Sequence, residues 1–215
     1  MGRPSPLLGA LVPDLRCTAL ILAGGLSTRM GQDKALLSYA GQTLLGQTCT
    51  ASLACTHDVH VFTPWPERYR AHVPAGVTLH FEPRAAGTAP GPLVALSQAL
   101  GCLTSADGWL LLLACDWWGL SGSVLVQGRQ QLSSLSAETV AYLPRSAKGW
   151  EPLHGFYRLS HLRQRLPAII AQGTSAFQPW LARETVTEWL LAKPVPMNCN
   201  TLADWQRAQH RMETR

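Results

Sequence analysis

A short apolar run that opens into a glycine-rich loop constrains the fold of this chain more than any other feature. Residues 18–22 (TALIL) form the run, and residues 23–25 (AGG) end it. Glycine tolerates positive φ and lets backbone N–H groups approach phosphate oxygens closely. Ser27 can donate a hydrogen bond, while Arg29 and Lys34 can neutralise phosphate charge. The segment therefore predicts a strand followed by a loop that holds a polyphosphate.

The spacing of this loop excludes two common phosphate-binding motifs. The Walker A motif requires GxxxxGK[ST], whereas here five residues separate Gly25 from Gly31 and the lysine follows only at position 34. The dinucleotide fingerprint GxGxxG is absent, which argues against an NAD-type oxidoreductase. A bare Gly-Gly pair would suggest an ordinary strand-to-helix turn, but the neighbouring Arg29, Asp33 and Lys34 favour a phosphate site.

Predicted strands and helices alternate along the chain. Strands are expected at residues 18–22, 59–63, 77–81, 109–114, 139–143, 155–158 and 186–191, and helices after Thr43, at 92–102, 121–132, 161–171 and 176–182, and from Thr201. This order is typical of a single-domain, Rossmann-like α/β fold with a doubly wound, mostly parallel sheet. Ligands bind beyond the carboxyl ends of such strands, where the motifs after Leu22, Phe81 and Ala114 fall.

The amino-acid composition limits the kinds of molecule that the protein is expected to bind. The 215 residues are 47% hydrophobic and 14% charged, which predicts one folded domain (17–215) after a flexible N-terminal arm (1–16). The net charge of +5 is scattered, which suits a pocket for anionic small molecules better than a nucleic-acid groove. The six cysteines show no disulfide or zinc spacing, and no apolar run reaches membrane-spanning length. We therefore expect a cytoplasmic protein without nucleic-acid or membrane partners.

The glycine-rich segment resembles the signature of the molybdenum cofactor guanylyltransferases, members of the nucleotidyltransferase superfamily. Their pattern is roughly LAGGxSxRMGxDKxLL, and residues 22–37 match it almost without a gap. The resemblance extends over about residues 18–207. It implies that GTP and molybdopterin or Mo-molybdopterin are substrates, that Mg²⁺ is the cofactor, and that the products are the guanine dinucleotide cofactor and pyrophosphate.

The resemblance also assigns roles to individual residues. It makes Arg29, Lys34 and Asp116 catalytic. The implied nucleotide-binding residues are Leu22, Ala23, Gly24, Gly25, Ser27, Lys34, Glu82 and Asp116. The implied substrate-binding residues are Arg145, Lys148, Asn198 and Asn200, and the implied metal ligands are Asp116 and Asn200.

Asp116 follows the continuously apolar run 109–114, which is typical of a buried central strand. A carboxylate there, facing a phosphate loop, can hold Mg²⁺ together with phosphate oxygens and water. The alternative is a helix cap near Ser121. The family usually reads PCDxP, whereas this chain has Ala114 before Cys-Asp and Trp117-Trp118 after it. The tryptophans can stack on a flat ligand or pack beneath the sheet, and we favour packing.

Glu82 stands where the family has an Asp that helps to recognise guanine. Its carboxylate can accept the N1–H and N2–H donors of guanine, but a solvated loop position is an equal alternative. The family's Asn after the second strand is missing near Phe62, which leaves the identity of the base open. Relatives that use CTP tend to have Ala-Ala-Gly where residues 23–25 read AGG, so the sequence favours GTP.

The remaining candidate residues lie in the second half of the chain. Arg145 and Lys148 can bind the terminal phosphate of molybdopterin or can be solvated surface cations. Glu151 stands at the family's usual His position, and His154 is interpreted equally well as structural or functional. Asn198 begins a segment similar to the family's N-x-N-T.

Two alternative functions remain open. One is a cytidylyltransferase for the same cofactor or another nucleotidyltransferase, and the other is a degenerate carrier that only binds nucleotide or pterin. Other cofactor-biosynthesis proteins, or the molybdoenzymes that receive the product, are candidate partners.

Overall fold

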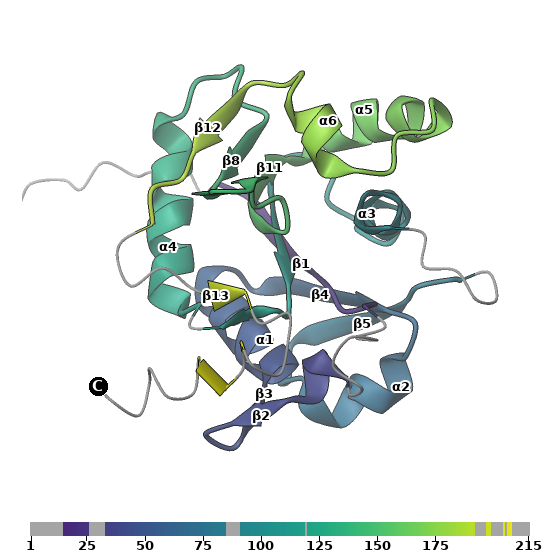
Figure 1. The fold of residues 1–215 in the computed structure, drawn as a ribbon, viewed down its shortest axis with the longest axis vertical. Helices are drawn as coiled ribbons and strands as arrows, with labels where there is room; N and C mark the ends of the chain where they lie inside the picture. Colours follow the sequence, from purple (N-terminus) through teal and green to yellow (C-terminus); the bar gives the residue numbers. More distant parts are fainter. Residues whose placement is uncertain are drawn as a thin grey trace, which may run out of the picture.

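The structure, a computed structural model, describes residues 15–25, 33–84, 91–118, 120–191, 197–198, 204 and 206–207. Its centre is a seven-stranded sheet with the order β12-β8-β11-β6-β1-β4-β5 (Figure 1). In chain order these strands are β1 (Cys17–Leu22), β4 (Asp58–Thr63), β5 (Val77–Phe81), β6 (Trp109–Ala114), β8 (Ala141–Leu143), β11 (His154–Arg158) and β12 (Val186–Glu188). Most of the predicted arm, residues 1–14, lies outside the described residues.

The sheet is mostly parallel, as predicted. β1 pairs in parallel with β4 and β6, β4 with β5, and β8 with β12. β11 is the exception, because it runs antiparallel to both β6 and β8. The short connection from Leu143 to His154 explains this orientation, since a parallel neighbour needs a crossover of about a dozen residues or more.

Helices cover both faces of the sheet (Figure 1). They are α1 (Leu44–Cys55), α2 (Pro66–Tyr69), α3 (Pro92–Leu100), α4 (Gly122–Gln131), α5 (Leu159–Ala171) and α6 (Phe177–Leu181), with short 3₁₀ turns η1 (Lys34–Leu36), η2 (Arg70–His72) and η3 (Leu132–Ser134). Short strand pairs lie beside the main sheet: β2 (Ser38–Tyr39) with β3 (Gln42–Thr43), β9 (Arg145–Ser146) with β10 (Gly149–Trp150), and β7 (Trp117–Trp118) with β13 (Met197–Asn198). Within the described residues, the fold is thus an α/β sandwich.

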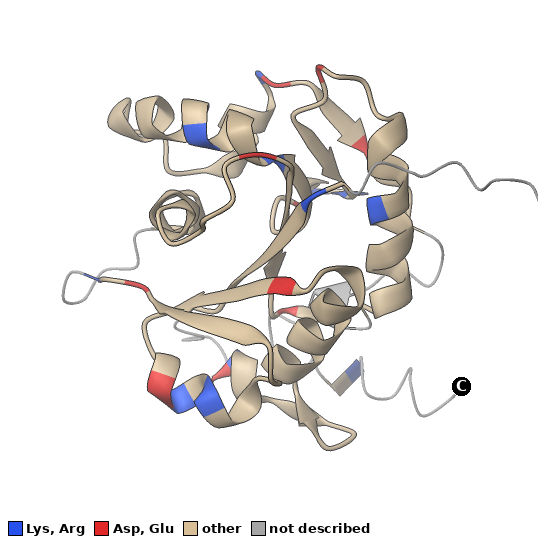
Figure 2. Ribbon diagram, turned by 180° about the vertical axis from the view of Figure 1, so that it is seen from behind, with Lys and Arg blue, Asp and Glu red and all other residues tan. Residues whose placement is uncertain are grey.

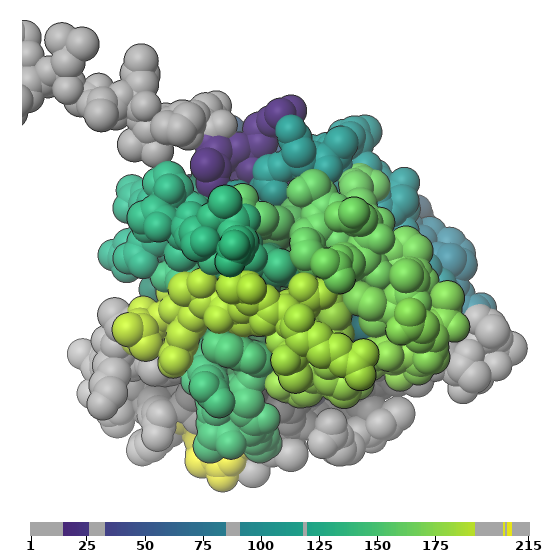
Figure 3. Space-filling model, turned by 90° about the horizontal axis from the view of Figure 1, so that it is seen from above, coloured from purple at the N-terminus to yellow at the C-terminus, as the bar shows by residue number. Residues whose placement is uncertain are grey.

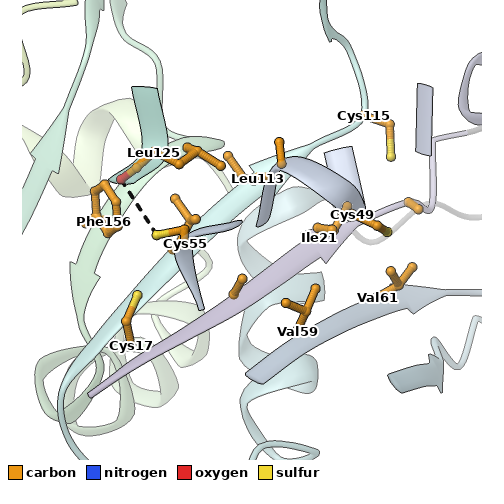
Figure 4. Packing of buried hydrophobic residues seen from close by; sticks show 14 of the residues in the cluster. Cys17, Ile21, Cys49, Cys55, Val59, Val61, Leu113, Cys115, Leu125 and Phe156 are labelled. Atoms are coloured by element: carbon orange, nitrogen blue, oxygen red, sulfur yellow. Dashed lines mark hydrogen bonds between the residues drawn. The ribbon is translucent and has the colours of Figure 1, made fainter. Parts of the chain in front are cut away.

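Side chains that alternate along the strands build two separate cores. Ile21 and Leu113 belong to the cluster that includes Leu45 of α1 and Leu125 of α4. Figure 4 shows this cluster, in which the Cys55 thiol donates a hydrogen bond to the carbonyl oxygen of Leu125 at 3.6 Å. The opposite face of the sheet packs against α3, α5 and α6 in a second cluster. The central strands are therefore buried on both faces.

Several boundaries differ from the sequence-based predictions, among them the end of β12 and the start of α5. The predicted strand 186–191 stops at Glu188, because Trp189 turns into the core and its N–H donates a hydrogen bond to the carbonyl of Leu143 at 2.8 Å. Figure 3 shows the segment that contains β12 lying across the top of the molecule. Helix α5 begins at Leu159, two residues before its predicted start.

Lys and Arg positions and Asp and Glu positions are both scattered over the ribbon of the described residues (Figure 2). Among the helices of these residues, none combines the length and apolarity that a membrane crossing requires.

Candidate functional site

The carboxyl ends of four parallel strands meet at one edge of the sheet. In the register of the sheet, Leu22 lies opposite Ala114 on one side and Phe62 on the other, and Thr63 lies opposite Phe81. The residues that follow these strands therefore share this edge. The structure thus brings residues 22–25, Glu82 and Asp116 to the same side of the sheet, where the sequence placed them.

The loop after β1 is held tightly against β4. The N–H of Ala23 donates to the carbonyl of Phe62 at 3.0 Å, and the Thr63 hydroxyl donates to the carbonyl of Ala23 at 2.9 Å. Gly24 follows, and a Cβ at this position would collide with the Glu82 carboxylate and the Arg84 guanidinium. A side chain at position 24 would therefore have to displace the ends of these two side chains.

Glu82 is buried, with 3% of its surface exposed, so the solvated-loop alternative is wrong. Its N–H donates to the carbonyl of Thr63 at 2.8 Å, and its Oε2 pairs with the guanidinium of Arg84 at 3.0 Å. Arg84 also donates to the carbonyl of Gly24 and lies over the ring of Trp65, 5.5 Å from its centroid. The buried pair of Glu82 and Arg84 thus lies against the loop of residues 22–25, and Arg84 is a partner that sequence reasoning missed.

Lys34 opens the 3₁₀ turn η1, which Asp33 fixes in place. Asp33 Oδ1 accepts the N–H of Ala35 at 3.1 Å, and Oδ2 accepts the hydroxyl of Tyr69 at 2.7 Å. The guanidinium of Arg68 lies 3.3 Å from the same Oδ2. Asp33 therefore connects η1 to α2. The positive charge of Lys34 reaches Asp116 and contributes to lowering the pKa of that carboxyl.

Asp116 lies in the tight turn between β6 and β7. Its side chain is 27% exposed, yet Oδ1 is buried and has no hydrogen-bond partner among the described residues. The helix-cap alternative is wrong, because Ser121 caps α4 by accepting the N–H of Val124 at 3.4 Å. Burial raises the pKa of Asp116, but His154 and Lys34 lower it by more, so the carboxyl titrates below its ordinary range. At neutral pH the site therefore presents a carboxylate.

His154 is the neighbour of Asp116 that sequence reasoning did not resolve. Its Nε2 lies 3.3 Å from Asp116 Oδ1, without the alignment of a full hydrogen bond. Its ring stacks on Trp117 with the centroids 3.9 Å apart and the planes 6° apart. Burial lowers the pKa of His154, although Asp116 acts in the opposite direction, so the imidazole is neutral at pH 7. Trp117 is buried, which confirms the expected packing role for this residue.

The second half of the chain contributes to the same edge through its backbone. β13 pairs antiparallel with β7, and this pairing places Asn198 opposite Trp117, next to the turn that carries Asp116. Ser27, Arg29 and Asn200 lie outside the described residues, so their expected roles stay predictions.

The two predicted phosphate-binding cations lie on the hairpin of β9 and β10. Arg145 and Lys148 are both exposed there, and the guanidinium of Arg145 lies over the ring of Trp150, 5.2 Å from its centroid. Their exposure agrees with both alternatives, a solvated surface cation and a contact with a phosphate, so the substrate-binding role stays a prediction. β8 is parallel to β6 through the shared neighbour β11, so the hairpin projects from the same edge of the sheet as Asp116.

The surroundings of Asp116 suit a divalent cation that also binds a nucleotide. The carboxyl group is partly exposed, and its buried oxygen has unused acceptor capacity. In the part of the chain that the structure describes, no cluster of three or more His, Cys, Asp and Glu side chains forms an all-protein metal site. A cation such as Mg²⁺ commonly takes one or two carboxylates and completes its shell with phosphate oxygens and water. The residues present fit that arrangement.

Comparisons with known proteins agree with this geometry. The family model of the MobA-like NTP transferase domain matches residues 19–187. A probable molybdenum cofactor guanylyltransferase of Nostoc sp. is 45% identical over 190 residues, which cover 87% of each chain. A protein of Synechococcus elongatus with the same name is 43% identical over 192 residues, covering 89% of this chain and 97% of its own.

Solved structures share the fold at lower identity. Rv0371c of Mycobacterium tuberculosis superposes with a TM-score of 0.72 at 20% identity, covering 91% of this chain and 98% of its own. A structure of Rv0371c in complex with manganese gives a TM-score of 0.65 at 19% identity, with coverages of 91% and 98%. Molybdopterin-guanine dinucleotide biosynthesis protein A of Archaeoglobus fulgidus gives 0.67 at 18% identity, with coverages of 92% and 100%.

Proposed function

Because the chain belongs to the MobA-like NTP transferase family and is a nucleotidyltransferase, we propose that it transfers GMP from GTP to molybdopterin or Mo-molybdopterin. The products are the guanine dinucleotide form of the cofactor and pyrophosphate. The observation that carries the proposal is the meeting of the glycine loop, residues 22–25, with Asp116 at one edge of the sheet, within reach of the charge of Lys34. The names of relatives that are 43–45% identical support the guanine and molybdopterin assignments.

The chemistry is an in-line displacement at the α-phosphorus of GTP. The terminal phosphate of the pterin attacks, the bond to the β-phosphate breaks, and pyrophosphate leaves with its electron pair. Such a reaction needs no covalent intermediate on the enzyme, so catalysis depends on positioning and on neutralising charge. The backbone N–H groups of Gly24 and Gly25 and the ammonium of Lys34 offset the charge on the phosphates. Arg29 and Ser27 extend this loop in the proposal.

Asp116 holds a divalent cation in this proposal, and we infer that the cation is Mg²⁺. When bound, such a cation supplies Lewis-acid stabilisation of phosphate charge. The manganese complex of Rv0371c supports a divalent metal at a site of this fold. Asn200 is proposed as a second oxygen ligand, and Asn198 lies beside it in sequence.

The pterin phosphate is proposed to approach over the β9–β10 hairpin. Arg145 and Lys148 are exposed there and can contact a phosphate without displacing a protein partner from a buried position. Arg145 keeps its contact with Trp150 in the described structure.

Glu82 is the proposed acceptor for the N1–H and N2–H groups of guanine. Its burial favours this role, because a hydrogen bond to a desolvated carboxylate discriminates strongly between bases. We expect GTP to bind at least about tenfold more tightly than CTP, which is about 1.4 kcal/mol. Calorimetry with GTP, CTP, ATP and UTP measures this difference. Glu82→Gln should reduce the preference for GTP, because the amide presents a donor to the base.

Equal affinities for GTP and CTP would favour the cytidylyltransferase alternative and leave the transferase class intact. Turnover separates the enzyme from a carrier that only binds nucleotide. A protein that binds GTP and a divalent cation but releases no pyrophosphate in the presence of molybdopterin would contradict the proposed reaction.

A further inference from the structure

Within the described residues, four buried polar atoms around the turn after β6 make no fully aligned hydrogen bond. They are Asp116 Oδ1, both ring nitrogens of His154 and Trp117 Nε1. Within the described residues, Arg84 Nε and Arg163 Nε are the other side-chain atoms in this condition. Unpaired buried polar groups lower stability, and each needs an explanation such as a catalytic role, a bound water or a bound ion. Asp116 Oδ1 and His154 Nε2 face each other at 3.3 Å, so the geometry of this one contact carries the argument that follows.

The His154 ring is held in one orientation. His154 begins β11, where it lies opposite Leu113 in the sheet, so its backbone is fixed. One face of its ring stacks almost parallel on Trp117 at 3.9 Å. With 3% of the residue exposed, the imidazole has little room to rotate. Its Nε2 therefore remains beside Asp116 Oδ1, 3.3 Å away.

We propose that His154 is a positioning residue for Asp116: its imidazole, clamped by Trp117, fixes the carboxylate in the orientation that binds the divalent cation and the nucleotide phosphates. This inference rests on the proposed function, in which Asp116 is the metal ligand. An imidazole suits the task because, unlike a lysine or arginine side chain, it carries no permanent positive charge that would compete with the cation. Groups that orient metal ligands in this way commonly change metal affinity 10–100-fold when they are removed.

A purely structural role for His154 makes a different prediction about stability. If the imidazole mainly stabilised the fold, its removal would lower the melting temperature, and metal binding would weaken only as a consequence. If it positions Asp116 at the expense of stability, replacement by an apolar ring should leave the melting temperature unchanged or raise it. Metal affinity should then fall without any loss of stability.

The test compares His154→Phe with His154→Gln. Phenylalanine keeps a ring that can stack on Trp117 and removes both nitrogens, whereas glutamine keeps an N–H donor and loses the aromatic ring. His80→Phe is the matched control, because His80 is a partly buried histidine on β5 whose Nε2 contacts His60 Nδ1 at 2.8 Å. The dissociation constant of Mn²⁺ is measured by EPR titration of the protein with GTP, and melting temperatures are measured without metal.

We expect His154→Phe to weaken Mn²⁺ binding on the order of 10–100-fold with no fall in melting temperature. His154→Gln should recover part of the affinity, and His80→Phe should bind Mn²⁺ like the wild type. Wild-type Mn²⁺ affinity in His154→Phe would overturn the inference. A melting temperature that falls in step with metal affinity in both variants would overturn it as well, since that pattern identifies a structural role.

Failure of the proposed function is recognised separately. It would be seen in the wild-type protein, which would then release no pyrophosphate from GTP and molybdopterin. The Mn²⁺ titrations of the variants still report on the orientation of Asp116 in that case, because they do not depend on turnover.

Discussion

Two carboxylates that lie close to Cys115 have surroundings of opposite kinds. Asp33, in the region of η1 and α2, accepts hydrogen bonds from Ala35 and Tyr69 and pairs with a guanidinium. Asp116, in the turn after β6, has a buried oxygen that receives no hydrogen bond from the described residues. The first acid is occupied by the protein itself, whereas the second keeps binding capacity for a ligand. The family pattern includes both acids. What distinguishes Asp33, which anchors the chain, from Asp116, which is the proposed metal ligand, is therefore the set of partners around each acid.

The largest expected effect is that of Asp116→Asn on turnover. The change preserves shape but removes the charge that would hold the cation in the proposed site, so we expect the rate to fall on the order of 10³-fold, about 4 kcal/mol of transition-state stabilisation. Stability should change far less than turnover, because among the described residues the buried oxygen makes only its 3.3 Å contact with His154. Steady-state kinetics over a Mg²⁺ series and a thermal melt check both parts. A variant with wild-type Mg²⁺ dependence would contradict the ligand role.

Lys34→Ala should lower turnover on the order of 10²-fold, which corresponds to about 2.7 kcal/mol. Lys34 begins the turn that Asp33 anchors, and its charge reaches Asp116. The matched control is Arg165→Ala, which removes an exposed cation from α5, away from the proposed site. A folded Lys34→Ala protein with nearly normal kcat would show that the loop does not act on the phosphates.

Asp33→Asn makes the same chemical change as Asp116→Asn and should give the reverse result. It weakens charge-assisted contacts with Tyr69 and Arg68, so we expect the free energy of unfolding to fall by about 2 kcal/mol. Urea denaturation measures this loss. Affinity for Mn²⁺ in the presence of GTP should stay near the wild-type value. If Asp33→Asn abolished metal binding and left stability intact, the contrast between the two acids would be lost.

The smallest expected effect concerns Tyr69 at alkaline pH. Burial and the contact with Asp33 raise the pKa of Tyr69, so its phenol stays protonated in the folded state at pH values where the unfolded chain ionises. Its contribution to stability is therefore complete below about pH 10 and declines above it, by at most about 1.4 kcal/mol per pH unit. At pH 8 we expect Tyr69→Phe to be about 1 kcal/mol less stable than the wild type.

Denaturation at pH 8 and near pH 11 tests this expectation. The difference in unfolding free energy between the wild type and Tyr69→Phe should be smaller at the higher pH. Tyr142 and Tyr157, whose pKa values are also raised by burial, are present in both proteins and cancel in the comparison. If the difference in unfolding free energy were the same at both pH values, the phenol proton of Tyr69 would not be held by a hydrogen bond to Asp33.

Sequence patterns predicted the main strands well because those strands are locally encoded. The bounds of β5 and β6 match the prediction at both ends, since each run is limited by Gly, Pro or Asp residues. The strand pairs β7–β13 and β9–β10 were not predicted, because a strand of two residues has no periodicity to detect. The antiparallel direction of β11 was also not predicted, since it depends on the length of the connection from β8 and not on the residues within the strand.

The candidate site was predictable where one segment supplied the signal. The placement of Gly24, Glu82 and Asp116 at one edge follows from their positions after parallel strands. The contacts of Arg84 with Gly24 and of His154 with Asp116 did not follow, because both are tertiary contacts that require the register of the sheet. The sequence does show Trp117 after one strand and His154 at the start of another. This pattern indicates a contact only once β11 is known to pair with β6.

The pairing of β7 with β13 has a consequence for biosynthesis. It joins residues 117–118 to residues 197–198, so about 80 residues of chain must be made before the turn that carries Asp116 is braced. Chains emerge from the ribosome N-terminus first, and β1, β4 and β6 can associate long before β13 exists. A nascent chain can therefore associate its central strands while the edge that carries Asp116 is still incomplete. The bracing of this edge has to wait until nearly the whole described chain has been made.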